Sequence, residues 1–217
     1  MRAVPPPADA ERPSLKRIVE GLRYARSRPE LIGTYVIDIV AMFFGMPTAL
    51  FPAMALSLGG PKVLGLLYAA PAVGSLVFSA TSGWTGRVRR HGLGVIVAAI
   101  LWGFAIIGLG LASGLIATLL CLALAGGADM MSGLFRQVIW NQTIPDSLRG
   151  RLASIEMLSY TSGPALGNFE AGAVASLFTI RISILSGGVL CVIGCALTAA
   201  LLPSFRAYDS RKFKAPA

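Results

Sequence analysis

The sequence predicts an all-α, polytopic membrane protein with six transmembrane helices. Apolar runs, most of them about 20 residues long, fill the chain of 217 residues at 31–55, 62–82, 93–112, 114–135, 152–178 and 182–203. A helix needs ~20 such residues to cross the roughly 30 Å hydrocarbon core of a bilayer. The composition agrees, with 55% hydrophobic residues, 13% charged residues and a mean hydropathy of +0.71. Soluble domains carry roughly 25% charged residues.

The positions of the basic residues predict the orientation of the chain. They concentrate in residues 1–30, in the second and fourth loops between the runs, and in the tail, whereas the other three loops hold only Lys62 and Arg181. Cytoplasmic loops are rich in Lys and Arg. We therefore expect a multi-pass protein of the inner (plasma) membrane with both termini in the cytoplasm. The net charge of +9 fits a lipid bilayer as the partner, and no nucleic acid is expected.

Catalytic and metal chemistry is not expected. The three cysteines lie inside apolar runs, where they are expected to pack as small side chains, and a metal site would need more ligands. His91 is the only histidine and lies in a polar loop. An intramembrane serine protease would need a histidine inside the membrane. We therefore expect no enzyme, no catalytic residues, no metal and no cofactor.

The elements follow in order. Residues 1–29 are expected to form a cytoplasmic linker with an amphipathic interfacial helix that Ser14 caps, residues 30–203 the six-helix bundle, and residues 204–217 a basic cytoplasmic tail. The first span carries Pro47 and Pro52, which predict a kink or a broken far end. Two glycine pairs, Gly110 with Gly114 and Gly163 with Gly167, are spaced for close helix contact.

Ionisable residues inside the runs are the candidates for function, because charges in a bilayer are costly. Asp38 lies in the first run, Asp129 and Arg136 lie on one face of the fourth, and Glu156 and Glu170 lie in the fifth. The third and sixth runs carry none, so they are expected to face lipid. The first, fourth and fifth runs must then turn toward water or toward each other.

Each of these residues has two interpretations. Asp38 and Asp129 either bond a neighbouring helix or handle a proton or cation, since a carboxylate removed from water favours its neutral form. Arg136 is expected to extend to the interface, with modulation of those carboxylates as the alternative. Glu156 is expected to pair with loop arginines. Glu170 is expected to be a gate or a solvated position near the outer surface.

Two loops carry a family resemblance. Residues 82–92 contain Gly83, Arg87, Arg89 and Arg90, and residues 145–151 contain Arg149, Gly150 and Arg151. These loops resemble the basic loops of the major facilitator superfamily in its carboxy-terminal six-helix half. Gly86 stands where that family has an aspartate, so this loop departs from the family pattern at the carboxylate of its latch. The segments 43–47 and 67–74 resemble the bacterial efflux branch related to the enterobactin exporter.

The resemblance implies half of a secondary transporter that exports a small amphipathic or siderophore-like substrate bound between two halves. In the family the seventh, eighth, tenth and eleventh helices line the pathway, which implies path or coupling roles for the membrane charges. Three explanations of a half remain: a truncated product, which is the simplest, a half that pairs with a separate half, or a homodimer. The alternative function is a non-transporting membrane protein, either a remnant or an assembly subunit.

Overall fold

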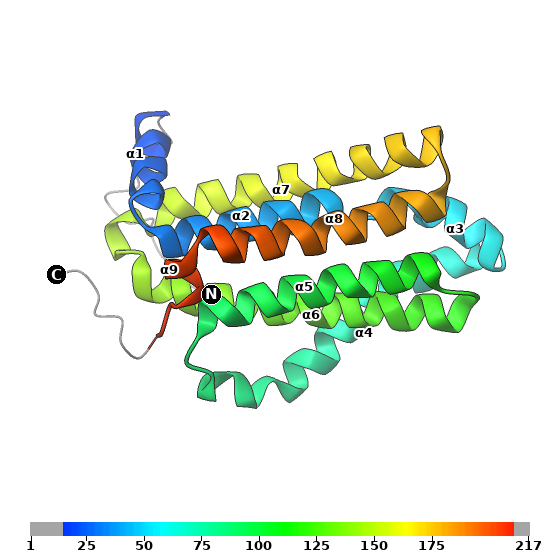
Figure 1. The fold of residues 1–217 in the computed structure, drawn as a ribbon, viewed down its shortest axis with the longest axis horizontal. Coiled ribbons are helices and arrows are strands. Elements are labelled where there is room, and N and C mark those ends of the chain that lie inside the picture. The colour runs from blue at the N-terminus through cyan, green and yellow to red at the C-terminus, as the bar shows by residue number, and fades with distance from the viewer. Residues whose placement is uncertain (1–14, 211–217) are drawn as a thin grey trace, which may run out of the picture.

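The computed structural model describes residues 15–210, and within that range every regular element is a helix (Figure 1). The elements are α1 (Leu15–Arg26), α2 (Pro29–Phe44), η1 (Thr48–Leu50), α3 (Phe51–Leu58), α4 (Lys62–Thr81), η2 (Ser82–Arg87), α5 (His91–Leu111), α6 (Leu115–Thr143), α7 (Asp146–Leu177), α8 (Ile180–Leu201) and α9 (Pro203–Arg206). The all-α fold predicted from the sequence is confirmed. Ser14, the predicted cap of the first helix, lies outside the described residues.

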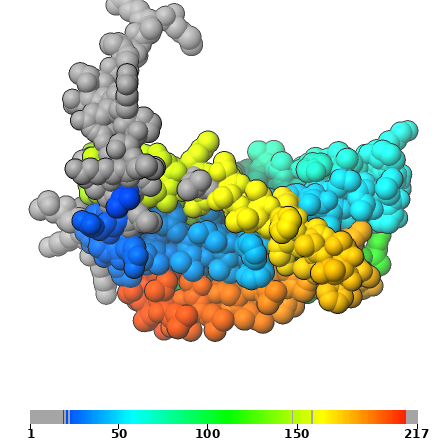
Figure 2. Space-filling model, turned by 90° about the horizontal axis from the view of Figure 1, so that it is seen from above, coloured from blue at the N-terminus to red at the C-terminus, as the bar shows by residue number. Residues whose placement is uncertain are grey.

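Five helical stretches of the described chain are long and apolar enough to cross a membrane: 29–58, 62–87, 91–111, 115–143 and 180–201. The fifth predicted run lies in α7, which has 32 residues and is the longest described helix. Polar residues, among them Asp146 and Arg149, dilute its apolar character. It nevertheless runs along the bundle beside α2, as Figures 1 and 2 show.

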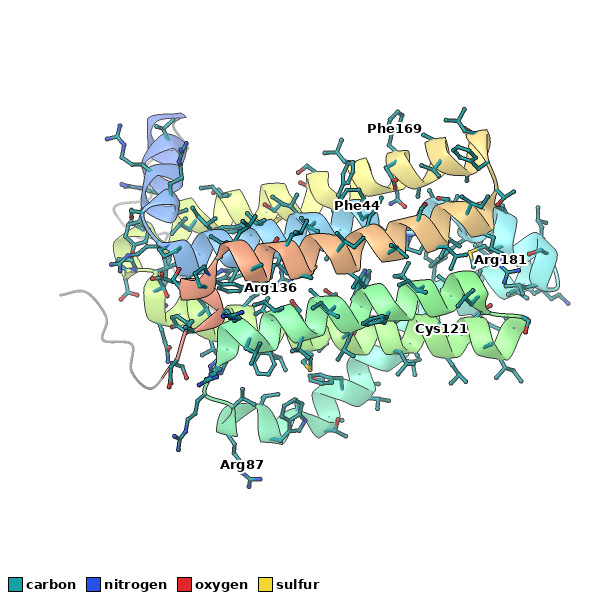
Figure 3. All side chains as sticks on the ribbon, in the orientation of Figure 1. Phe44, Arg87, Cys121, Arg136, Phe169 and Arg181 are labelled. Carbon is teal, nitrogen blue, oxygen red and sulfur yellow. The ribbon has the colours of Figure 1, made fainter. Side chains whose placement is uncertain are left out.

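The bundle has two distinct ends. α1 crosses one end, which we call the near end, and α9 and both described chain ends lie there too (Figure 1). The loop that carries Arg87 is at the near end, whereas Arg181 is at the opposite, far end (Figure 3). The sequence-based division of basic and non-basic loops therefore corresponds to the two ends of the described bundle.

α5 lies at the centre of the packing, between α6 and α8. The expectation that the third run faces lipid was wrong for half of the run, because 50% of its apolar window is buried. Only one stripe of α5 faces outward, comprising Leu93, Val97, Leu101, Phe104 and Leu111. α8 likewise turns one apolar stripe outward, comprising Ile182, Val189, Leu190, Ile193, Leu197 and Leu201.

Glycines allow the helices to approach closely. A Cβ atom on Gly126 of α6 would collide with the backbone carbonyl of Pro71 in α4, and one on Gly167 of α7 would collide with the carbonyl of Met42 in α2. The hydroxyl of Ser75 donates to the Gly126 carbonyl at 2.8 Å across the same α4–α6 contact. The close contact predicted at Gly163 and Gly167 is thus confirmed, since Gly163 also packs on Met42. Of the other predicted pair, Gly110 packs closely on Leu185 of α8, whereas a Cβ atom on Gly114 would meet nothing within 4 Å, so the prediction was wrong for Gly114.

The first span is broken, as its prolines predicted. α2 ends at Phe44, and the chain continues through η1 into α3, with Pro47 at the start of η1. The side chain of Asn168 in α7 bridges the break, because its Oδ1 accepts from the Thr48 hydroxyl and from the Ala49 N–H, each at 2.7 Å. The break therefore has a polar anchor on a neighbouring helix.

Both described chain ends dock onto the near end. The Tyr24 hydroxyl of α1 donates to the Thr143 carbonyl at 2.6 Å. Phe205 of α9 is fully buried against Gly33 of α2. The Tyr208 hydroxyl donates to the Gln142 side chain at 2.8 Å.

A buried charge cluster as candidate functional site

The centre of the candidate site is an ion pair between two helices. The Arg136 guanidinium of α6 contacts the Asp38 carboxylate of α2, and the two side chains are only 3% and 8% exposed. α2 begins, and α6 ends, at the near end. At 1.5 Å rise per residue both groups lie about 10–14 Å in from that end. The pair meets because the two antiparallel helices bring opposite charges to the same level.

Aromatic residues from two helices surround the guanidinium. Its central carbon lies 5.8 Å from the ring centre of Trp140 in α6 and 5.6 Å from that of Tyr160 in α7. The Trp140 Nε1–H donates to the Thr34 hydroxyl of α2 at 3.0 Å. The expectation that Arg136 extends to the interface was therefore wrong. A carboxylate and two rings at its own level stabilise the charge inside the bundle instead.

Two further carboxylates interact electrostatically with Arg136. They are Asp129, which lies on the same face of α6 as Arg136, and Glu156 of α7. Asp38, Asp129, Arg136 and Glu156 are called the charge cluster below. With every group ionised, its three carboxylates would exceed its one cation by two charges. Such an excess in a low-dielectric interior favours the uptake of a proton or a cation.

A small cavity connects two members of the cluster. Asp38 and Asp129 line it together with Ser132 of α6 and Trp102 of α5, and its volume of about 10 Å³ suits a single water molecule. The Trp102 Nε1 is buried without a hydrogen-bond partner among the described residues. Sequence reasoning missed Trp102, because it looked for charges and the third run has none. Trp102 has the one side chain of that run that can donate a hydrogen bond, and this was the available signal.

Glu170 does not join the charge cluster. It lies fourteen residues beyond Glu156 on α7, which corresponds to roughly 21 Å along the helix. It is partly exposed, past Pro164 on the far half of α7. Within residues 15–210, His, Cys, Asp and Glu side chains form no group of three that could hold a metal ion.

The loop residues identified from the sequence lie on the near-end surface. Arg87, Arg89 and Arg90 are exposed around η2 and the start of α5. Cβ atoms on Gly83 and Gly150 would meet nothing within 4 Å.

Arg149 pairs with Asp146 at 3.1 Å, with 54% and 91% of their side chains exposed. Exposed pairs of this kind contribute about 0–1 kcal/mol. Arg151 starts the next turn of α7 and is half-buried. The loop arginines thus form a charged surface at the near end, and Arg149 pairs within the first turn of α7.

Comparison with known proteins identifies the family to which this chain belongs. The profile described as transmembrane secretion effector matches residues 2–217. The enterobactin exporter EntS of Citrobacter koseri is 27% identical over 197 residues, which cover 90% of this chain and 47% of that protein. The enterobactin exporter EntS of Escherichia coli O81 is 28% identical over 203 residues, covering 92% and 49%. The chain spans about half the length of the curated relatives it matches, and no solved structure matches it.

Proposed function

Because the chain belongs to the transmembrane secretion effector family of the major facilitator superfamily, we propose that it forms the carboxy-terminal six-helix half of a transporter that exports a small molecule. Its relatives are exporters about twice as long. The proposed substrate is an amphipathic or siderophore-like molecule bound against a second six-helix half. That half is either a separate segment or chain, or a second copy of this one.

The observation that carries the proposal is the charge cluster inside the spanning helices. A charged residue at the centre of a bilayer costs about 2.5–3.5 kcal/mol on insertion scales. The cluster joins three helices, since Asp38 is on α2, Asp129 and Arg136 are on α6, and Glu156 is on α7. A chain that needed these contacts only for stability could use apolar packing, which often serves as well as a buried ion pair.

The proposed mechanism couples a proton to a change of ion pairing. While Asp38 is ionised, Arg136 is held by it, and α2 and α6 are held together. A proton on Asp38 removes that attraction and leaves Arg136 to the carboxylates of Asp129 and Glu156. The binding of a proton thereby favours a different arrangement of α2 against α6 and α7. Glu170 is proposed to act near the far mouth of the pathway, outside this exchange.

The orientation and the partner surface complete the proposal. The near end, with the exposed arginines around η2, is the cytoplasmic end, and α1 lies in the headgroup region there. α4 and α7 expose many large apolar side chains, including Tyr68, Val73, Leu76, Met157, Leu166 and Phe169. The second half is proposed to cover part of this surface, and lipid the rest.

The test is gradient-driven export in proteoliposomes. The purified chain is reconstituted alone, with the amino-terminal half of a full-length relative, and with that half plus Asp129→Asn. Asp146→Asn is the matched control, because it removes an exposed carboxylate outside the charge cluster and outside the proposed pathway. Siderophore-type and amphipathic dye probes report export under an imposed pH gradient.

We expect no export by the chain alone, export with the second half, and loss of export in Asp129→Asn at an unchanged protein level. Asparagine keeps the shape of the side chain but cannot carry a proton. Asp146→Asn should retain the gradient-driven activity. Robust export by the monomeric chain alone would refute the half-transporter proposal, and full activity of Asp129→Asn would remove that residue from the mechanism.

A further inference from the structure

A second cavity lies at the far end of the bundle, remote from the charge cluster. Its volume is about 240 Å³, and it lies between α3, the α5–α6 turn and the start of α8. The wall is mainly apolar, and includes Met54, Leu58, Leu109 and Ile184. Pockets for whole drug-sized ligands usually measure about 300–1,000 Å³. The cavity is therefore suited to part of an apolar ligand and not to a complete transported molecule.

Arg181 is the charged residue of this cavity. It lies in the first turn of α8, beside α3 (Figure 3). The helix dipole disfavours a cation at this end of a helix, and the first turn of α8 holds no acidic residue. Among residues 15–210, no carboxylate lies within ion-pair distance of its guanidinium. The cavity thus combines an apolar wall with a cation that lacks an anion.

The hydroxyl groups in the wall already donate to backbone carbonyls, so they are not available as donors to an anionic ligand. Ser57 donates to the Met54 carbonyl at 2.8 Å, and Thr118 donates to the Gly114 carbonyl at 3.0 Å. Both donors are thus used within their own helical turns. Arg181 is therefore the side-chain donor of the wall that a ligand in the cavity would meet. A guanidinium group binds phosphate in a bidentate manner.

We propose that this cavity binds an anionic phospholipid of the leaflet at the far end. Its phosphate contacts Arg181, and the first part of one acyl chain lies against the apolar wall. The depth fits, because the α5–α6 turn and the start of α8 mark the end of the spanning helices, where headgroups lie. The ligand would bridge α3, which follows the break in the first span, and α8, because residues of both helices line the cavity. This inference does not depend on transport activity.

The test is native mass spectrometry of the full chain in detergent, titrated with phosphatidylglycerol or phosphatidylcholine of equal chain length. The variants are Arg181→Gln, Arg181→Lys and Ala112→Phe, which places a ring in the cavity while keeping the arginine. Lys62→Gln is the matched control, because it removes the other cation of the far-end loops and lies outside the cavity wall. Glycerol phosphate serves as the headgroup without acyl chains.

We expect wild-type protein to retain phosphatidylglycerol over phosphatidylcholine. Arg181→Gln should weaken phosphatidylglycerol binding roughly tenfold, as the loss of a charge-assisted hydrogen bond predicts. Arg181→Lys should keep part of the preference, Lys62→Gln all of it, and Ala112→Phe should lower retention with the charge intact. Equal retention of the two lipids by wild type, an unchanged preference in Arg181→Gln, or displacement of the lipid by equimolar glycerol phosphate would overturn the proposal.

Discussion

Replacing Arg136 by methionine removes the cation of the charge cluster and leaves the buried carboxylate of Asp38 beside the partly buried carboxylates of Asp129 and Glu156. The Arg136 and Asp38 side chains are 3% and 8% exposed, so water cannot compensate for the loss. Removing one partner of a buried pair typically costs about 3–5 kcal/mol. For a chain of this size each kcal/mol corresponds to roughly 2–4 °C in Tm. We therefore expect Arg136→Met to lower the apparent midpoint by roughly 10 °C.

Removing the carboxylate of the pair should cost less stability than removing the cation. Asp38→Asn leaves Arg136 with the carboxylates of Asp129 and Glu156, so the expected cost is about 1–3 kcal/mol, the range for one lost partner of a buried polar group. The double variant should be more stable than Arg136→Met alone, since it removes one uncompensated carboxylate together with the cation.

The assay is the fraction of detergent-purified protein that remains monodisperse after heating at a fixed rate. Arg149→Met is the control, because its pair with Asp146 is exposed and its loss should cost at most about 1 kcal/mol. If Arg136→Met were as stable as Arg149→Met, or if Asp38→Asn were the more damaging single variant, the cluster would not be organised around Arg136.

Three further predictions concern packing and orientation. Gly126→Ala should lower the midpoint of the same heating assay, because its Cβ collides with a carbonyl of α4, whereas Gly133→Ala, whose Cβ meets nothing within 4 Å, should be tolerated; equal behaviour of the two would contradict the close α4–α6 contact. Asn168→Leu should increase proteolysis or hydrogen exchange at η1, since it removes the acceptor of two 2.7 Å hydrogen bonds, and unchanged protection there would show that the bridge is dispensable. In a variant without native cysteines, a cysteine at Arg181 should react with an impermeant reagent added outside cells, and one at Arg87 only after permeabilisation; the opposite pattern would invert the proposed orientation.

The sequence was most informative where one physical effect dominates. Six long apolar runs allow few structures besides a helical bundle, and Pro47 cannot continue a helix without losing a hydrogen bond. Both predictions were confirmed. Asp38 and Asp129 could be selected as candidates because a carboxylate in an apolar run is rare, and the structure places both on one cavity.

The sequence was misleading where two environments look alike in composition. A lipid-facing helix and a helix buried among others both consist of apolar residues, so the absence of charge in α5 did not reveal its central position. What distinguishes it is Gly103, which brings α8 close. For Arg136, extension to the interface and pairing with a carboxylate are both physically reasonable. Only the relative level of α2 and α6 decides between them, and that is a property of the fold.

The burial of Phe205 has a consequence for the order in which the protein can be completed during synthesis. Its ring fills the space left by Gly33, a residue in the first turns of α2, although 172 positions of sequence separate the two. Hairpins such as α5–α6 can form as soon as they leave the ribosome, since their partners are adjacent in the chain. The near end of α2 acquires its contact with Phe205 only after the intervening helices have been inserted. α2, which enters the bilayer before the other described spans, is thus among the last of them to acquire its full set of neighbours.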